Sequence, residues 1–192
     1  MYKSGHLNGM TDTQEKGAIS KADIVAAIIA STREVFSTML SMEVTWQEIH
    51  LQQTIAALPA SGIISLIGLT GPWAGTGSIS CNAEFACTLS AKMLMGACPE
   101  VNEEVLDAIA EITNMIIGNV KTVLEQKVGD MGLSTPTVIF GLNFQIRSAQ
   151  THEWTGVRFT SGGQEMCVLV CLDPATPKNH RTGFQFPQLL SG

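Results

Sequence analysis

The sequence predicts an α+β domain in which about six strands form a mostly antiparallel sheet and three helices pack against it. Two observations lead to this fold class. Apolar residues recur with the helical period in three long segments, and shorter segments between them alternate with the strand period. The links between neighbouring strands are short, and short links favour antiparallel hairpins.

Composition is typical of one globular domain, with 192 residues, 45% apolar and 15% charged. The net charge of −6 argues against a nucleic-acid or an anionic membrane partner, because both require basic patches. No apolar run is long enough for a membrane helix. The five cysteines lack Cys-x-x-Cys spacing, which favours a reduced, cytoplasmic protein.

Three regions are expected along the chain. Residues 1–18 lack periodicity and are interpreted as a disordered leader, residues 19–173 as the folded domain, and residues 174–192 as an irregular tail rich in proline. The first helix begins after Ser20, where Asp23 completes a capping box, and its apolar stripe continues to about Leu40.

Strands and a second helix follow. Alternation predicts a strand over 42–47, and a continuous apolar run predicts a strand buried on both faces over 63–69. The glycine-rich segment 71–77 is interpreted as a turn before a return strand over 78–81, since it lacks the Lys-Ser/Thr of a phosphate-binding loop. Asn82 caps the second helix, which Gly96 ends.

The third and longest helix spans 102–127, between an Asn102 cap and Gly129. After Pro136, alternating residues predict a strand over 138–146. Two more strands over 154–160 and 166–172 complete the sheet, with hairpin links that include Gly162-Gly163.

The long helix has an apolar arc and an opposite polar stripe. The apolar arc faces the core and consists of Val105, Leu106, Ile109, Ile112, Ile116, Val120, Val123 and Leu124. On the polar stripe, Glu111 and Asn114 are surface neighbours, with Asp107 one turn before and Gly118 one turn after. An exposed glycine inside a helix is unfavourable, and it leaves room for another backbone. The pattern alone leaves open a solvated face or a functional one.

The run Asp107-x-x-x-Glu111-x-x-Asn114, with Met115-Ile116-x-Gly118-Asn119 and then Pro136, resembles the CheC/CheX/FliY phosphatases of bacterial chemotaxis, most closely the CheX type. The resemblance covers about residues 24–173. It implies a phosphatase that acts on the phosphoaspartate of a CheY-like response regulator. It also implies a homodimer that binds no metal itself, with Mg²⁺ on the regulator.

The resemblance also assigns roles to the residues of the stripe. Asn114 orients the hydrolytic water, and Glu111 pairs with a lysine of the regulator. The expected contact surface for the regulator extends to Asp107, Gly118, Lys121 and Thr122. Two-site relatives carry a second Glu-x-x-Asn on the first helix, where this chain has Glu34 and Ser37, so one site per chain is expected.

Other chemistry has less support from the sequence. The four histidines lack metal-ligand spacing, and no Gly-x-Ser-x-Gly or Ser-x-x-Lys motif marks a serine nucleophile. Two alternatives to a phosphatase stay open. One is a binding or scaffold module for a phosphorylated regulator or a flagellar or receptor component, and the other is a structural dimerisation domain.

Overall fold

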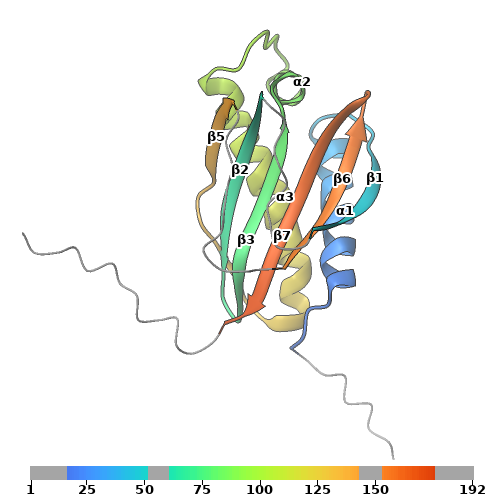
Figure 1. The fold of residues 1–192 in the computed structure, drawn as a ribbon, viewed down its shortest axis with the longest axis vertical. Helices are drawn as coiled ribbons and strands as arrows, with labels where there is room; N and C mark the ends of the chain where they lie inside the picture. Colours follow the sequence, from blue (N-terminus) through green and yellow to red (C-terminus); the bar gives the residue numbers. More distant parts are fainter. Residues whose placement is uncertain (1–16, 52–60, 143–152, 176–192) are drawn as a thin grey trace, which may run out of the picture.

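A computed structural model describes residues 17–51, 61–142 and 153–175. Within these ranges the chain forms three helices and seven strands (Figure 1). The helices are α1 (Lys21–Thr38), α2 (Ala83–Leu94) and α3 (Glu103–Val128). The strands are β1 (Thr45–Leu51), β2 (Ser61–Thr70), β3 (Trp73–Asn82), β4 (Gly132–Leu133), β5 (Thr137–Leu142), β6 (Trp154–Ser161) and β7 (Gln164–Pro174).

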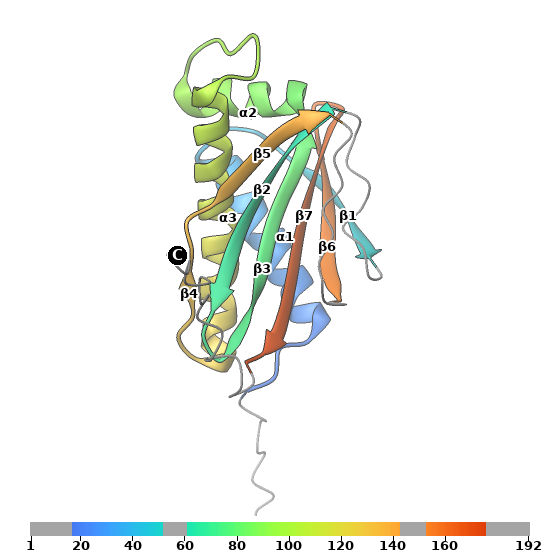
Figure 2. The same ribbon diagram turned by 60° about the vertical axis from the view of Figure 1, so that its left-hand side comes forward.

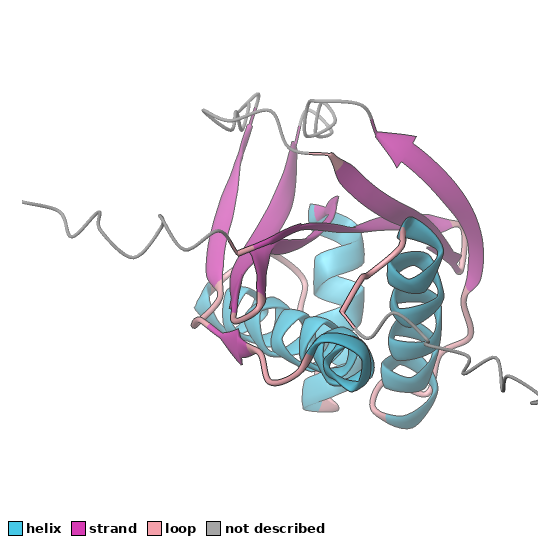
Figure 3. Cartoon of the chain, turned by 90° about the horizontal axis from the view of Figure 1, so that it is seen from below, coloured by secondary structure: helices cyan, strands magenta, loops and turns pink. Residues whose placement is uncertain are grey.

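The strands form one sheet, in the order β1-β6-β7-β3-β2-β4, with β5 also paired to β2. Every described pairing is antiparallel, and the helices lie on one face of the sheet (Figure 3). The predicted α+β class is therefore confirmed. The hairpin β6–β7 turns at Gly162 and Gly163, whose φ angles of +58° and +81° belong to the left-handed region that favours glycine.

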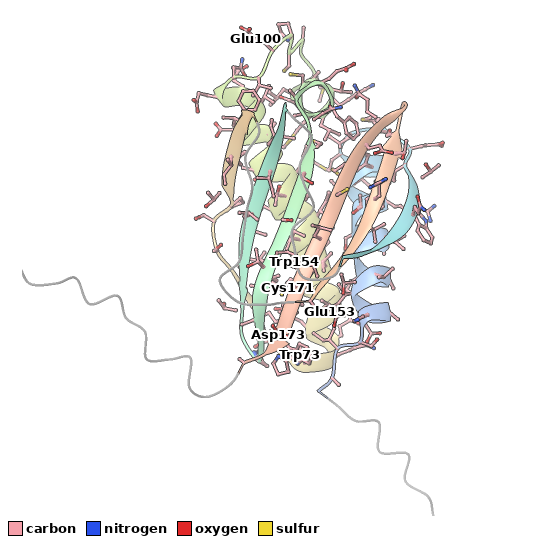
Figure 4. All side chains as sticks on the ribbon, in the orientation of Figure 1. Trp73, Glu100, Glu153, Trp154, Cys171 and Asp173 are labelled. Atoms are coloured by element: carbon pink, nitrogen blue, oxygen red, sulfur yellow. The ribbon has the colours of Figure 1, made fainter. Side chains whose placement is uncertain are left out.

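The main core lies between the helices and the sheet, and a smaller apolar cluster lies on the other face. Strand β2 contributes Ile63 and Ile67 to the first and Ile64 to the second, as its continuous apolar run predicts. Trp154 on β6 and Cys171 on β7 belong to the second cluster (Figure 4).

The helix boundaries follow the predicted caps. Ser20 and Asp23 form the capping box of α1, and Asn82 accepts a hydrogen bond from the Phe85 N–H at the start of α2. Asn102 accepts from the Val105 N–H at 3.0 Å, and Gly129 ends α3. These side chains satisfy backbone donors that the first helical turn leaves without partners.

The apolar arc of α3 faces the core as predicted, and Ile109, Ile112 and Ile116 are buried. Val123 is the exception, because it is 42% exposed near the end of the helix. A helical wheel gives the angular position of a residue, but it does not say how far along the axis the covering elements extend.

The first strand begins later than predicted, at Thr45 instead of Met42. Ser41 and Met42, which precede this strand, form the turn that follows α1. Ser41 has a left-handed φ of +51°, and the Met42 N–H donates to the Phe36 carbonyl at 2.9 Å.

The predicted turn over 71–77 is wrong in its length, because β3 already begins at Trp73. Two of its glycines serve packing. A Cβ at Gly75 would lie 1.9 Å from the Cys171 carbonyl oxygen of β7, and a Cβ at Gly77 would lie 2.8 Å from the Ile117 side chain of α3. Gly77 therefore lets α3 pack close to the sheet.

Several predictions fall outside the described residues, namely the strand positions 143–146, most of the leader and most of the tail. The division of the chain at 18 and 173 stays a prediction. Strand β7 extends one residue past that boundary, to Pro174.

Candidate functional site

Helix α3 presents Asp107, Glu111 and Asn114 on one exposed side of its N-terminal half. None of these three side chains has a hydrogen-bond or ion-pair partner within the part of the chain that the structure describes. An ionised carboxylate accepts hydrogen bonds, and a carboxamide both donates and accepts them. All three side chains are therefore available to bind another molecule.

The three side chains border a small hollow with a volume of about 360 Å³. Its other wall is the segment Ser134–Thr135–Pro136, which joins β4 to β5. Strand β5 runs beside α3 (Figure 2), so the hollow lies between the polar side of the helix and the edge of the sheet.

The wall formed by residues 134–136 is fixed to the sheet. The Ser134 N–H donates to the Gly68 carbonyl at 2.9 Å, and the Gly68 N–H donates to Ser134 Oγ at 2.8 Å. These three residues lie opposite Ile67 and Gly68 of β2, so the wall contains one residue more than the strand beside it. An extra residue breaks the ladder in the manner of a β-bulge, and Pro136 could not donate to the ladder in any case.

The C-terminal half of the polar stripe contacts its own chain. Lys121 Nζ pairs with Glu125 Oε1 at 2.6 Å, and the same oxygen accepts from the Met131 N–H at 2.8 Å. The hydrogen bond from Lys121, followed by that from Met131, lowers the pKa of Glu125. Gly118 is half-buried, and a Cβ there would lie 3.6 Å from Leu133 Cδ1.

The predicted site residues are thus divided by their surroundings. Asp107 lies beside Glu111 and Asn114 at the hollow, whereas Gly118 lies near Leu133 of β4 and Lys121 pairs with Glu125 on its own helix. Thr122 is exposed and donates to the Gly118 carbonyl at 3.0 Å. Whether any of these residues contacts a partner stays a prediction.

The first helix has no comparable arrangement. Glu34 and Ser37 are exposed, and the Ser37 hydroxyl donates to the Glu34 carbonyl at 3.0 Å. Neither residue lines the hollow.

Two other kinds of feature are absent from the part of the chain that the structure describes. Among the described residues, no group of three or more histidine, cysteine or acidic side chains is placed to hold a metal ion. None of the described helices has the length and apolar character needed to cross a membrane.

Sequence reasoning missed the opposite wall of the hollow. Ser134 and Thr135 lie 20 or more residues after Asn114, and no local pattern links them to it. Pro136 was the one available signal, since a proline directly before a strand marks a break in pairing.

Comparison with known proteins first gives the class. The structure is similar to a CheC-like superfamily protein from Shewanella sp. PV-4, with a TM-score of 0.69, 26% identity, and coverage of 79% of this chain and 97% of that one. It also has the fold of CheX in a CheX–CheY–BeF₃–Mg²⁺ complex from Borrelia burgdorferi, with a TM-score of 0.62, 23% identity, and coverage of 78% and 97%. The protein therefore has the fold of CheC-like proteins.

Sequence comparison then gives the family. Residues 63–160 match the family described as "Chemotaxis phosphatase CheX". The chain is also 30% identical over 128 residues to the CheY-P phosphatase CheX of Thermotoga maritima, which covers 66% of this chain and 81% of the relative. The chain belongs to the CheX family of chemotaxis phosphatases.

Proposed function

We propose that this protein hydrolyses the phosphoaspartate of a CheY-like response regulator, and that Glu111 and Asn114 act at the regulator's phosphorylation site. The observation that carries the proposal is that both side chains are exposed at one hollow and have no partner in the described residues. The proposal is supported by the Thermotoga relative, which is a CheY-P phosphatase, and by the Borrelia CheX–CheY complex.

The reaction requires little catalytic apparatus from this chain. Water attacks the phosphorus, the bond from phosphorus to the aspartyl oxygen breaks, and inorganic phosphate and the free aspartate are formed. An acyl phosphate is already reactive, because the aspartate carboxylate is a good leaving group. Catalysis of phosphoryl transfer depends mainly on positioning and on stabilisation of charge.

Asn114 is suited to positioning the water. Its carboxamide oxygen accepts a hydrogen bond from the water while its NH₂ group donates to an oxygen of the phosphoryl group or the water. The group is neutral, so it does not repel the phosphoryl oxygens. It lies one turn after Glu111, so the two side chains reach the same partner surface.

Glu111 is suited to docking. Together with Glu100, Glu103, Glu104 and Asp107 it belongs to an acidic run from residue 100 to 111 without a lysine or arginine. A lysine at the regulator's phosphorylation site would pair with the Glu111 carboxylate. This charge complementarity fixes the orientation of the complex and speeds its formation.

The fixed wall of residues 134–136 gives the hollow a defined width. We infer that the regulator's loops rest against this wall, so that the Asn114 carboxamide reaches the phosphoryl group at one depth. The Mg²⁺ in this proposal is bound by the regulator, where it neutralises charge on the transferred group.

The test is a dephosphorylation time course with candidate phosphorylated regulators, using the unmodified protein, Glu111→Ala and Glu34→Ala. Glu34 is a matched control, because it is also an exposed helical glutamate with no side-chain partner in the described residues. We expect one site per chain, so Glu34→Ala retains activity and Glu111→Ala loses most of it. A folded Glu34→Ala variant without activity would contradict the single site. Binding of the regulator without any turnover would favour a non-catalytic binding module instead.

A further inference from the structure

We propose that a second, apolar hollow at the end of α2 belongs to the same interface and receives an apolar side chain of the response regulator, flanked by basic residues. The inference rests on the proposed function, and it adds a second anchor roughly 14 Å from the site. The apolar side chain that enters the hollow belongs to the face of the regulator that carries the phosphoaspartate.

The second hollow has a volume of about 1060 Å³ and lies between α2, residues 95–101 and strand β5. Its surface is formed mainly by small and apolar side chains, among them Cys87, Ala91, Met95, Cys98, Val101 and Phe140. Apolar surface in a concave site is the usual place for an interface anchor.

Large apolar side chains are exposed around this hollow. Met95 and Phe140, which line it, are 95% and 46% exposed, and Leu94, which directly precedes Met95, is 49% exposed. These are three of the six large apolar residues that are exposed in the described part of the chain. Grouped apolar exposure of this kind marks a contact surface more often than a chance feature.

Met95 occupies a backbone position that does not suit it. It follows α2 with a left-handed φ of +52°, a conformation for which glycine or asparagine is favoured. Its side chain is almost wholly exposed, so packing within the chain does not offset this cost. A flexible, polarisable methionine is well suited to contact another protein.

The two hollows have no lining residue in common, but α3 and β5 connect them. Val101 in the second hollow lies immediately before the α3 cap, and from Asn102 to Glu111 the helix rises about 14 Å. On the other side, β5 follows Pro136 of the first hollow and carries Phe140 of the second, roughly 14 Å further along. A protein interface of ordinary size covers about 800 Å² on each partner, a patch roughly 30 Å across. A regulator docked on Glu111 therefore reaches the second hollow.

Charge indicates the chemistry of the occupant. Glu84 and Glu100 line the second hollow together with one cation, Lys92. Glu100 lies in the link between α2 and α3, at the upper end of the molecule in Figure 4, and the acidic run continues from it to Glu111. The complementary surface is an apolar side chain with basic neighbours.

The first experiment measures affinity for a regulator activated with beryllofluoride and Mg²⁺, by titration calorimetry, and the KM for the phosphorylated form. The variant is Met95→Ser, and its matched control is Met39→Ser, because Met39 is an exposed methionine, 51% accessible, just after α1 and outside the hollow. Loss of this apolar contact is expected to weaken binding about tenfold. The loss appears in KM more than in kcat, and Met39→Ser binds normally.

The second experiment uses the cysteines of the hollow as a footprint. Burial raises the pKa of the Cys87 thiol, so alkylation is done at mildly alkaline pH and followed by mass spectrometry. Bound regulator should slow alkylation of Cys87 several-fold. Cys167 is also half-buried but lies on the opposite face of the sheet from the helices, so its rate should not change.

Three outcomes would overturn the inference. Unchanged affinity in Met95→Ser with no protection of Cys87 shows that the hollow is not used. If Met95→Ser changes the sedimentation coefficient of this protein alone but leaves its affinity for the regulator unchanged, the second hollow is a contact between copies of this chain. Absence of any regulator binding removes the interface altogether. If the regulator binds in a Met95-dependent way but is not dephosphorylated, the proposed phosphatase activity fails and the inferred interface stands.

Discussion

At the scale of single residues, the polar stripe of α3 has two halves with different surroundings. Asp107, Glu111 and Asn114 have no partner among the described residues, whereas Lys121 is paired with Glu125 at 2.6 Å. Lys121 was expected to contact the regulator, and its ion pair indicates that it also helps to hold the β4 segment through Glu125 and Met131. Availability for a partner is therefore greatest at the N-terminal half of the stripe.

The first prediction concerns Glu111. Glu111→Ala should weaken regulator binding and lower turnover together, because the carboxylate fixes the orientation on which turnover depends. Calorimetric titration and steady-state rates measure the two effects. Glu111→Lys should weaken binding and turnover further, since the introduced lysine and the lysine of the regulator would repel each other. Full activity and affinity in Glu111→Lys would contradict the docking role and favour a solvated stripe.

At the scale of elements, helix boundaries were predictable because capping is local. Ser20 with Asp23, and Asn102 alone, mark helix starts within one turn of sequence, and the structure confirms them. Asp23 has a further contact that the local pattern could not show. Its carboxylate accepts from Lys127 Nζ at 2.6 Å, which ties the start of α1 to the end of α3.

This contact predicts a dependence of stability on pH. The hydrogen bond from Lys127, followed by those from Ser20, lowers the pKa of Asp23 from 3.8 to about 2. The ionised form is therefore favoured in the folded state, and its stabilisation is present above about pH 4 and lost as the pH falls towards 2. Both side chains are partly exposed, so the effect is modest.

Thermal melts of the unmodified protein and of Asp23→Asn provide the measurement. The difference in Tm should be largest near neutral pH and should shrink towards pH 2. A difference that does not change with pH would show that the Asp23 charge is not responsible.

The strands were less predictable than the helices, because glycine has more than one use. Gly75 and Gly77 were interpreted as turn residues, and both lie inside β3. A side chain at Gly75 would collide with Cys171 of β7, and one at Gly77 would collide with Ile117 of α3. Both of these neighbours are distant in sequence. A single sequence does not distinguish a turn glycine from one that allows close packing.

Gly77→Ala tests this packing. The new methyl group would lie 2.8 Å from Ile117, so α3 or its side chain must shift, and overpacking of this kind costs about 1–3 kcal/mol. Urea unfolding measures the loss. The double variant Gly77→Ala with Ile117→Ala should lose less than the sum of the two single variants, because alanine lacks all three carbons of Ile117 that the new methyl group would meet. Strict additivity would contradict the contact as the cause.

At the scale of the whole molecule, the fold class and the exposed side of α3 were predictable from the sequence, because periodicity indicates which face of an element is buried. The exposed positions of Glu111 and Asn114 are confirmed. The walls of both hollows were not predictable, since Ser134 and Thr135 meet α3, and Phe140 meets α2, only through sheet register. The predicted homodimer and the roles of the site residues stay predictions.

The arrangement of the molecule explains why the proposed site needs a second protein. Helix α3 lies against the sheet and presents its polar side outward, beside a wall held by β2. In the proposal this chain supplies a carboxamide and a carboxylate in fixed positions, and the regulator supplies the phosphoryl group, its Mg²⁺ and a lysine. The central claim is that Asn114 acts on the attacking water.

The most direct test compares Asn114→Ala with the unmodified protein in two paired measurements, a binding titration with beryllofluoride-activated regulator and a single-turnover dephosphorylation assay. Loss of one positioning group should slow hydrolysis by about 10²-fold or more, equivalent to roughly 2.7 kcal/mol of barrier, while affinity stays nearly the same. Asn114→Asp should be at least as slow, because a carboxylate repels the phosphoryl group and does not donate. If Asn114→Ala loses affinity in the same proportion as rate, Asn114 is a docking residue and the water-positioning mechanism is wrong.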